Sequence, residues 1–198
     1  MDIVFKDDTV PYAIYKSIPI PFKVKKEIDC DVRLGIIEPQ GTPTKWCARM
    51  VVAPKKDGTP RRTVDLQQLK KVTLRENHYT QTPFKIVSAT PKNTYKTVLD
   101  AWNGYHSLPL SPSVKDATTL ITEWGRYLYK HAPMWFHASG DAYTHHFNDI
   151  TKEFDRVSRC VDNSLLWDTH FFCYKKLLFK KSGWEFLNLL PNLRLKVS

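Results

Sequence analysis

The sequence predicts an α+β fold with a largely antiparallel sheet, and three observations lead to that prediction. Apolar residues recur every four positions near the N-terminus, as they do in a helix that covers a core. Short stretches rich in Val and Leu alternate with turn residues, as strands do. In the second half the expected order is strand, helix and hairpin, which is typical of α+β proteins. With 198 residues, of which 42% are hydrophobic, the chain is long enough to bury a core.

The first predicted elements are an arm and a helix. Residues 1–21 are rich in Pro and Ile and predict an extended N-terminal arm. A helix is predicted over 22–34, because Val24, Ile28 and Val32 would share one face and Gly35 would end it.

A hairpin and a short helix come next. Strands are predicted over 46–54 and 61–66, on either side of a turn that contains Asp57-Gly58. The Asp-Gly pair favours such a turn because both residues accept the backbone angles that it requires. Asp65 is expected to cap a short helix that runs to Lys71.

The second half predicts short strands, one helix and a closing hairpin. The strands are expected at 97–100, 105–110, 118–122 and 126–131. The helix is expected to begin at 139–141. Residues 158–161 and 164–167 then form two strands joined by an Asp162-Asn163 loop, since both residue types tolerate turns.

Charge is distributed unevenly along the chain, whose net charge is +10. Residues 1–100 carry 18 Lys and Arg against 11 Asp and Glu, a balance of +7. Residues 101–168 carry 6 against 8, a balance of −2, and residues 169–198 carry 6 against 1, a balance of +5. A basic part attracts phosphates and an acidic part can hold divalent metal, so the pattern suits a protein that handles a polyanion. Ordinary solubility of a basic domain is the alternative explanation.

The composition excludes several classes of protein. Six Trp, ten Phe and nine Tyr argue against a disordered chain. The apolar runs are far shorter than the roughly 20 residues of a membrane span, so no membrane partner is expected. Four Cys without close pairing predict no disulfide framework, and an intracellular location, cytoplasmic or nuclear, is expected.

Two carboxylates stand at the ends of short apolar strands. Asp100 ends Thr97-Val98-Leu99-Asp100, and Asp162 ends Cys160-Val161-Asp162. Acids at the ends of neighbouring strands can converge within a few ångströms, and such oxygen ligands suit Mg²⁺. From spacing alone, a helix cap at Asp100 and a turn residue at Asp162 are the more common explanation.

Five motifs follow one another along the chain: GIIEP at 35–39, MVVAPKKDG at 50–58 with Arg61 and VDL at 64–66, VLDAWNGYH at 98–106, SGDAYT at 139–144 and CVDNSLLWD at 160–168. In this order they resemble the motifs of retroelement reverse transcriptases, in the form typical of gypsy-like LTR retrotransposons. The resemblance covers residues 22–168. It implies a fingers–palm fragment of the right-hand polymerase fold, without a thumb.

The resemblance also implies a division of the chain. The implied parts are an extended arm at 1–21, fingers at 22–96, a palm at 97–168 and a degenerate tail at 169–198. The tail is either a palm helix and strand or out-of-frame sequence.

Roles for five residues follow from the resemblance. Asp100 and Asp162 are similar to the two catalytic carboxylates that bind metal in the family, and two Mg²⁺ ions are the implied cofactor. Lys55 and Arg61 stand where the fingers contact the incoming triphosphate, and both side chains suit phosphate. Tyr105 stands where a ring crowds the sugar 2′ position. Without the resemblance, Lys55 would be a solvated hairpin tip and Tyr105 a half-buried strand residue.

Three positions depart from the family pattern and are expected to be degenerate. The family has Pro-Gln-Gly-Phe before the palm helix, where this chain has Pro133-Met134-Trp135-Phe136. Met134 cannot form the hydrogen bonds of Gln, and Trp135 puts a large ring where Gly lets a backbone approach closely. Asn163 replaces the second acid of the catalytic hairpin and so removes one negative charge.

By descent, the chain is expected to be an RNA-directed DNA polymerase, a nucleotidyltransferase that extends a primer on an RNA or DNA template. The implied partners are a template–primer, deoxynucleoside triphosphates and the remaining domains of a Pol polyprotein. The three departures and the missing thumb predict weak or absent activity. One alternative is a catalytically inactive retroelement relic that binds nucleic acid, and another is a pseudogene product without a role.

Overall fold

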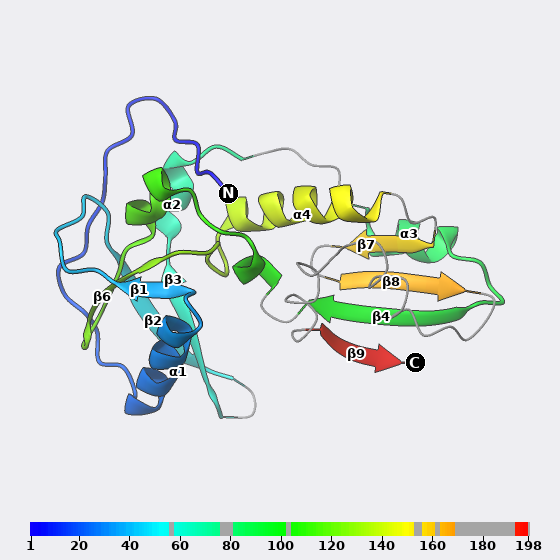
Figure 1. The fold of residues 1–198 in the computed structure, drawn as a ribbon, viewed down its shortest axis with the longest axis horizontal. Coiled ribbons are helices and arrows are strands. Elements are labelled where there is room, and N and C mark those ends of the chain that lie inside the picture. The colour runs from blue at the N-terminus through cyan, green and yellow to red at the C-terminus, as the bar shows by residue number, and fades with distance from the viewer. Residues whose placement is uncertain are drawn as a thin grey trace. The chain divides into compact units, whose positions relative to one another are not determined.

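The computed structural model describes residues 1–55, 58–75, 81–101, 104–152, 156–160, 163–168 and 193–197. The chain folds as two compact units, each made of two separate stretches (Figure 1). Met1–Glu76 and Tyr105–Ala142 make the first unit, and Asn77–Gly104 and Tyr143–Ser198 make the second. Helices and strands occur in both units, so the predicted α+β class is confirmed. Among the described residues, no helix is both long enough and apolar enough to cross a membrane.

The first unit holds a five-stranded sheet with the order β1-β6-β5-β2-β3. Its strands are β1 (Ile37–Pro39), β2 (Ala48–Pro54), β3 (Pro60–Asp65), β5 (Leu120–Thr122) and β6 (Gly125–Tyr129). β2 and β3 pair as an antiparallel hairpin, with Ala53 opposite Arg61, so the predicted hairpin is confirmed. β2 and β5 are the parallel neighbours in this sheet.

Helix α1 (Phe22–Arg33) covers this sheet with one apolar face. Val24 and Ile28 are fully buried, as their spacing predicts. The helix ends at Arg33, and Gly35, directly after the C-cap residue Leu34, has a φ of 71° that glycine adopts at little cost. The N–H of Gly35 donates to the carbonyl of Val32 at 3.0 Å, which satisfies one of the last helix carbonyls. The predicted helix and its glycine end are therefore confirmed.

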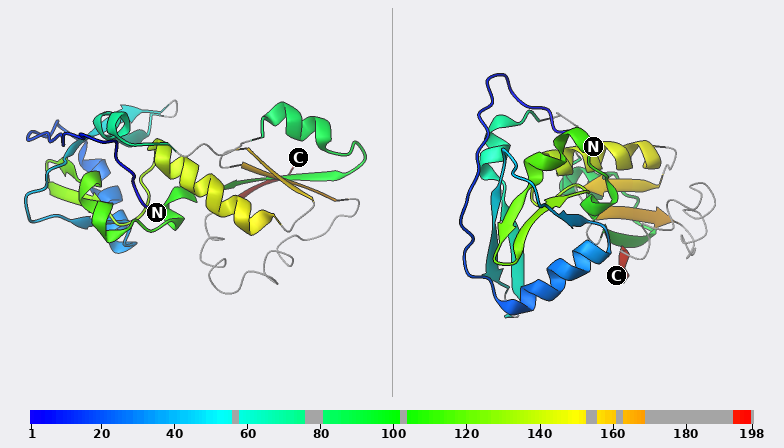
Figure 2. Two further views of the ribbon diagram at one scale, coloured as in Figure 1. Left: turned by 90° about the horizontal axis from the view of Figure 1, so that it is seen from above. Right: turned by 60° about the vertical axis from the view of Figure 1, so that its left-hand side comes forward.

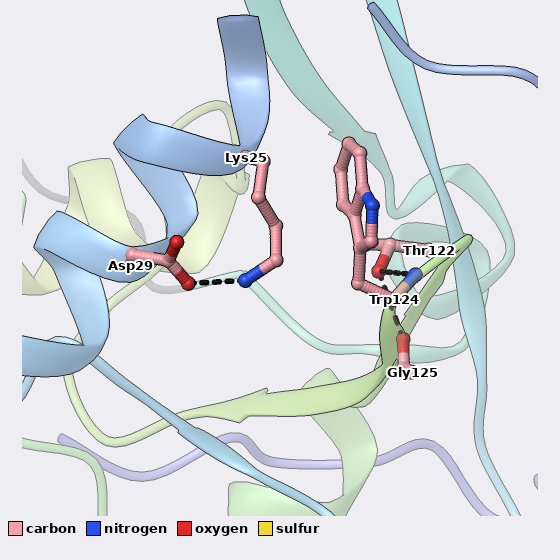
Figure 3. A network of polar contacts seen from close by, with 5 residues as sticks. All are labelled: Lys25, Asp29, Thr122, Trp124 and Gly125. Atoms are coloured by element: carbon pink, nitrogen blue, oxygen red, sulfur yellow. Dashed lines mark hydrogen bonds and ion pairs between the residues drawn. The ribbon is translucent and has the colours of Figure 1, made fainter. Parts of the chain in front are cut away.

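The turn between β5 and β6 meets the start of α1 (Figure 3). The hydroxyl of Thr122 accepts from the backbone N–H of Trp124 at 3.2 Å and donates to the carbonyl of Gly125 at 3.0 Å. The ammonium of Lys25 lies 6.0 Å from the centre of the Trp124 ring and also pairs with Asp29, which raises the pKa of Lys25. The turn thus presents its indole to the helix.

The core of the first unit joins the sheet, α1 and the N-terminal arm. Its most buried members include Ile3, Ile20, Val24, Ile28, Ile37, Met50, Leu66, Leu69, Leu120 and Phe136. The arm is extended and pairs through single bridges at Phe5 with Thr73 and at Ala13 with Cys47. The short helix α2 (Gln67–Val72) follows β3, and a carboxylate oxygen of Asp65 accepts from the N–H of Gln67 at 3.2 Å. The N-cap position is occupied by Leu66, so the predicted cap at Asp65 is wrong by one residue, although Asp65 does bond the first N–H of α2.

The second unit holds a four-stranded sheet with the order β7-β8-β4-β9. The strands are β4 (Tyr95–Ala101), β7 (Val157–Cys160), β8 (Asn163–Asp168) and β9 (Leu193–Val197), and every neighbouring pair is antiparallel. Helix α3 (Pro83–Ala89) lies on one side of this sheet (Figure 2). Helix α4 (His137–Thr151) begins in the first unit and ends in the second.

Several sequence-based expectations differ from the structure. A strand over 105–110 is wrong in its first half, where the chain forms a short 3-10 helix, η1 (Gly104–Ser107), and its second half makes only a single antiparallel bridge, from Pro109 to His131. A second 3-10 helix, η2 (Pro112–Thr118), precedes β5. A loop made of Asp162-Asn163 is also wrong, because Cys160 pairs directly with Asn163, which is the first residue of β8. The helix expected from 139 begins two residues earlier, at His137. In the tail at 169–198 the structure describes only residues 193–197, so the palm helix suggested there lies outside the described residues.

Candidate nucleotide and metal sites

The β2–β3 hairpin carries the two residues expected to contact a triphosphate. Its tip is closed by hydrogen bonds from the N–H of Lys55 to the carbonyl of Thr59 at 2.8 Å and from the N–H of Gly58 to the carbonyl of Lys55 at 3.0 Å. Gly58 has a φ of 75°, which suits glycine at this turn. Lys55 is exposed near the tip, while Lys56 and Asp57 lie outside the described residues.

The adjacent residues Arg61 and Arg62 have different environments, because successive side chains of a strand point to opposite faces. The guanidinium of Arg62 lies 3.1 Å from the carboxylate of Glu27 and 2.6 Å from that of Asp31. Both acids belong to α1, so Arg62 ties the hairpin to that helix. Arg61 is exposed, and its guanidinium carbon lies 4.0 Å from the centre of the Trp135 ring. Arg61 is therefore the more exposed of the two.

Trp135 and Met134 form the turn that precedes α4. Pro133 and Phe136 on either side are buried, which fixes both ends of the turn. Trp135 has a φ of 68° and is 50% exposed, and Met134 is half-buried. A positive φ is the conformation for which glycine is favoured, and a larger residue there costs about 1–2 kcal/mol. The chain therefore keeps a glycine-type backbone at a position where it has tryptophan.

Tyr105 lies in η1 and is half-buried. Its hydroxyl is 3.9 Å from the point where a Cβ would lie at Gly140, the second residue of the SGDAYT motif. The tyrosine and the start of α4 are thus neighbours within the first unit. A role of Tyr105 in sugar selection stays a prediction.

In the second unit, the backbone pairs two of the predicted site positions. Asp100 of β4 stands opposite Asn163 of β8, and opposite Cα atoms in an antiparallel pair lie about 4.5–5.5 Å apart. Asp162 lies outside the described residues, directly before Asn163 in the sequence. The expected convergence of the Asp100 and Asp162 carboxylates on a shared metal site stays a prediction.

A cluster of His106, Tyr129, Asp31 and Arg62 was not predicted from the sequence. His106 stacks on Tyr129 with ring centres 6.3 Å apart, and its Nδ1 lies 3.1 Å from the carbonyl of Ala132. Burial lowers the pKa of His106, and burial of its hydroxyl raises the pKa of Tyr129 to about 12. The charges of Asp31 and Arg62 act on both rings. These groups are suited to holding α1, β3 and β6 together.

A second unpredicted interaction fixes the start of α4. Arg75 donates to Asp141 through two bonds, Nε to Oδ2 at 3.2 Å and a terminal nitrogen to Oδ1 at 2.9 Å. These bonds raise the pKa of Arg75. Asp141 belongs to the SGDAYT motif, so this acid has a structural partner within the first unit. Within the described part of the chain, no group of three or more His, Cys, Asp or Glu side chains is arranged to hold a metal ion.

The chain is similar in sequence and in fold to foamy-virus proteins. It is 27% identical over 152 residues to the Pro-Pol polyprotein of simian foamy virus type 1, which covers 75% of this chain and 13% of the polyprotein. No family model matches the chain.

Solved structures of foamy viral protease-reverse transcriptase share the fold. One in complex with double-stranded DNA superposes with a TM-score of 0.77 at 19% identity, over 97% of this chain and 40% of that one. Another, in complex with an RNA/DNA hybrid, gives 0.75 at 21% identity, over 98% of this chain and 26% of that one. The chain thus spans less than half the length of these relatives. Together, the comparisons support a reverse-transcriptase-like domain of retroviral or retroelement type.

Proposed function

We propose that this chain is the fingers–palm part of a gypsy-like reverse transcriptase, an RNA-directed DNA polymerase by descent with impaired catalysis. The observation that carries the proposal is the pairing of Asp100 with Asn163, within a fold shared with foamy-virus reverse transcriptases. Its partners would be an RNA or DNA template–primer, deoxynucleoside triphosphates and other domains of a Pol polyprotein.

Nucleic-acid binding is supported by relatives and by charge. Foamy viral protease-reverse transcriptase has been solved with double-stranded DNA and with an RNA/DNA hybrid. In this chain, residues 1–100 carry a charge of +7, and Lys55 and Arg61 are exposed on one hairpin. Basic groups of this kind neutralise phosphates without reading sequence.

The implied metal fits the donors that the chain offers. Asp100 and Asp162 would hold Mg²⁺, since Mg²⁺ prefers a small number of carboxylate oxygens and keeps room for substrate phosphates. The register supports this, because Asp100 is paired with the residue that follows Asp162. When bound, two Mg²⁺ ions would activate a 3′ hydroxyl and stabilise the leaving pyrophosphate. Lys55 and Arg61 would hold the phosphates of the nucleotide, and Tyr105 would exclude a 2′ hydroxyl.

Three residues support the impairment. Asn163 is neutral at the position paired with Asp100, so one negative charge near the metals is absent. Met134 offers no amide for a template or nucleotide, and Trp135 fills space that glycine would leave open. The second candidate function is therefore an inactive relic that retains only nucleic-acid binding. The neutral Asn163 opposite Asp100 favours it, because the chain lacks one of the charges that would help to hold metal there.

Binding is tested by titrating the full chain with a short RNA–DNA duplex at several salt concentrations. We expect affinity to fall steeply as salt rises, because phosphate contacts release counterions. Lys55→Ala and Arg61→Ala should weaken binding of a deoxynucleoside triphosphate more than binding of the duplex. Lys26→Ala, which removes an exposed charge from α1, is the matched control. Duplex affinity that does not depend on salt would contradict the charge argument.

Catalysis is tested by primer extension on an RNA template with Mg²⁺. We expect negligible incorporation by the chain, and Asn163→Asp alone should not restore full activity, because Met134 and Trp135 remain. Robust extension by the unchanged chain would refute the impairment. Incorporation by Asn163→Asp that Asp162→Ala abolishes would support polymerase descent and the assignment of Asp162.

A further inference from the structure

The contact between Arg61 and Trp135 leaves the binding edge of the guanidinium available. The guanidinium carbon of Arg61 lies over the Trp135 ring, 4.0 Å from its centre, which is within cation–π range. The face of an indole ring holds no oxygen or nitrogen acceptor, so this contact does not occupy the five N–H donors of the guanidinium. The contact therefore orients Arg61 without consuming its hydrogen bonds to a ligand.

Both partners of the contact stand on well-fixed backbone. Arg61 lies in β3 opposite Ala53, and the next residue, Arg62, binds two acids of α1. The Trp135 turn is anchored by the buried side chains of its two neighbours, Pro133 and Phe136. An indole held in this way restricts a long side chain that would otherwise sample many rotamers.

We infer that Trp135 is a positioning residue that holds the guanidinium of Arg61 as a preformed fork for the triphosphate of a nucleotide. This rests on the proposed function, in which Arg61 meets phosphate. Planar forks bind phosphate through two parallel bonds, and less freedom is lost on binding when the fork is already aligned. Trp135 departs from the glycine of the family, and here that departure supplies the support for Arg61.

The test measures the affinity of the full chain for inorganic triphosphate by isothermal titration. Trp135→Phe keeps an aromatic face and Trp135→Leu removes it, and both replacements put an L-residue at the same positive φ. Backbone strain is therefore matched between the two variants. Trp135→Leu should weaken binding about two- to five-fold, the fold-change of an exposed cation–π contact, and Trp135→Phe should retain most of the affinity.

Measurements in an Arg61→Ala background separate the positioning role of Trp135 from the proposed phosphate-binding role of Arg61. If Trp135 acts through Arg61, Trp135→Leu has no further effect in that background. If Arg61→Ala itself leaves triphosphate affinity unchanged, the proposed function of Arg61 is wrong. If Arg61→Ala weakens binding while Trp135→Leu leaves it unchanged or strengthens it, the positioning role is wrong and the proposed function stands. The affinity for a short RNA–DNA duplex, measured in parallel, should fall less on Trp135→Leu than the affinity for triphosphate does. An equal fall would mean that the Arg61 fork binds phosphates of the nucleic-acid backbone, and this would overturn the inference.

Discussion

Replacing Arg62 by alanine is expected to destabilise the first unit far more than replacing its neighbour Arg61. Arg62 pairs with Asp31 at 2.6 Å and with Glu27 at 3.1 Å. The Asp31 side chain is 11% exposed, so its charge would be left with little water after the substitution. Arg61 instead contacts the half-exposed ring of Trp135.

The expected size follows from those burials. A fully buried ion pair that loses one partner costs about 3–5 kcal/mol. Here the Arg62 side chain is 26% exposed, so water reaches part of the site, and we expect about 2–3 kcal/mol. The pair with Glu27, which is 41% exposed, adds less than about 1 kcal/mol. Arg61→Ala should cost below about 1 kcal/mol, the value of an exposed cation–π contact.

The assay is urea unfolding of the two variants and the unchanged chain, followed by circular dichroism. A third variant, Arg62→Met with Asp31→Leu, removes both charges and should recover most of the loss, because apolar replacements of a buried pair are often neutral. If Arg62→Ala and Arg61→Ala unfold at the same urea concentration, the reasoning about opposite strand faces is refuted.

Three further outcomes are expected. Lowering the pH from about 7.5 to about 5 should reduce the melting temperature. Burial lowers the pKa of His106, His131 and His137 in the folded chain below the ordinary value of about 6.5. As the pH falls below that value, the histidines of the unfolded chain take up protons first, and this stabilises the unfolded chain relative to the folded one. His106→Asn should flatten this dependence, and an equal slope would contradict it. Ile3→Ala should lower the free energy of unfolding by about 2–4 kcal/mol, because Ile3 is 4% exposed. Val4 is exposed, so Val4→Ala should change the free energy of unfolding by less than about 0.5 kcal/mol. Equal losses in the two variants would mean that the arm is not anchored at Ile3. Without Mg²⁺, Asn163→Asp should lower the melting temperature slightly, because the new carboxylate is paired with Asp100 and like charges at paired positions repel by about 0.2–1 kcal/mol. Added Mg²⁺ should restore the melting temperature. A decrease that does not depend on Mg²⁺ would argue against a metal at Asp100.

The sequence predicted those elements that are determined by residues close together in the chain. The spacing of Val24 and Ile28, the glycine at 35 and the Asp57-Gly58 pair led directly to α1 and to the β2–β3 hairpin. The strand over 105–110 was wrong in its first half, because residues 104–107 form a 3-10 helix and only Pro109 makes a bridge, with His131, which is distant from it in sequence. Helix α3 was missed because only one of its residues, Ile86, is buried, although Thr82 before Pro83 was a usable start signal.

Only those residues of the candidate site that belong to a recognised motif could be predicted from the sequence. Lys55, Arg61 and Tyr105 could be placed by resemblance, and the register now pairs Asp100 with Asn163. Partners from distant parts of the chain left no local signal. In the sequence, Asp31 is a polar residue between apolar positions of a helix. Its role as an ion-pair partner depends on Arg62, which lies 31 positions further along the chain (62 − 31 = 31). The stacking of Arg61 on Trp135 likewise joins segments that only the fold brings together.

The position of β4 in its sheet has a consequence for synthesis on the ribosome. β4 pairs with β8 on one side and with β9 on the other, yet it is made before both. From Ala101 to Asn163 the ribosome adds 62 residues, and from Ala101 to Leu193 it adds 92. At about 5–20 residues per second, the apolar Thr97-Val98-Leu99 segment waits about 3–12 s for its first partner and about 5–18 s for its second. Unpaired strands of this kind attract other strands, so the nascent chain is expected to need chaperones most during the interval between β4 and β8.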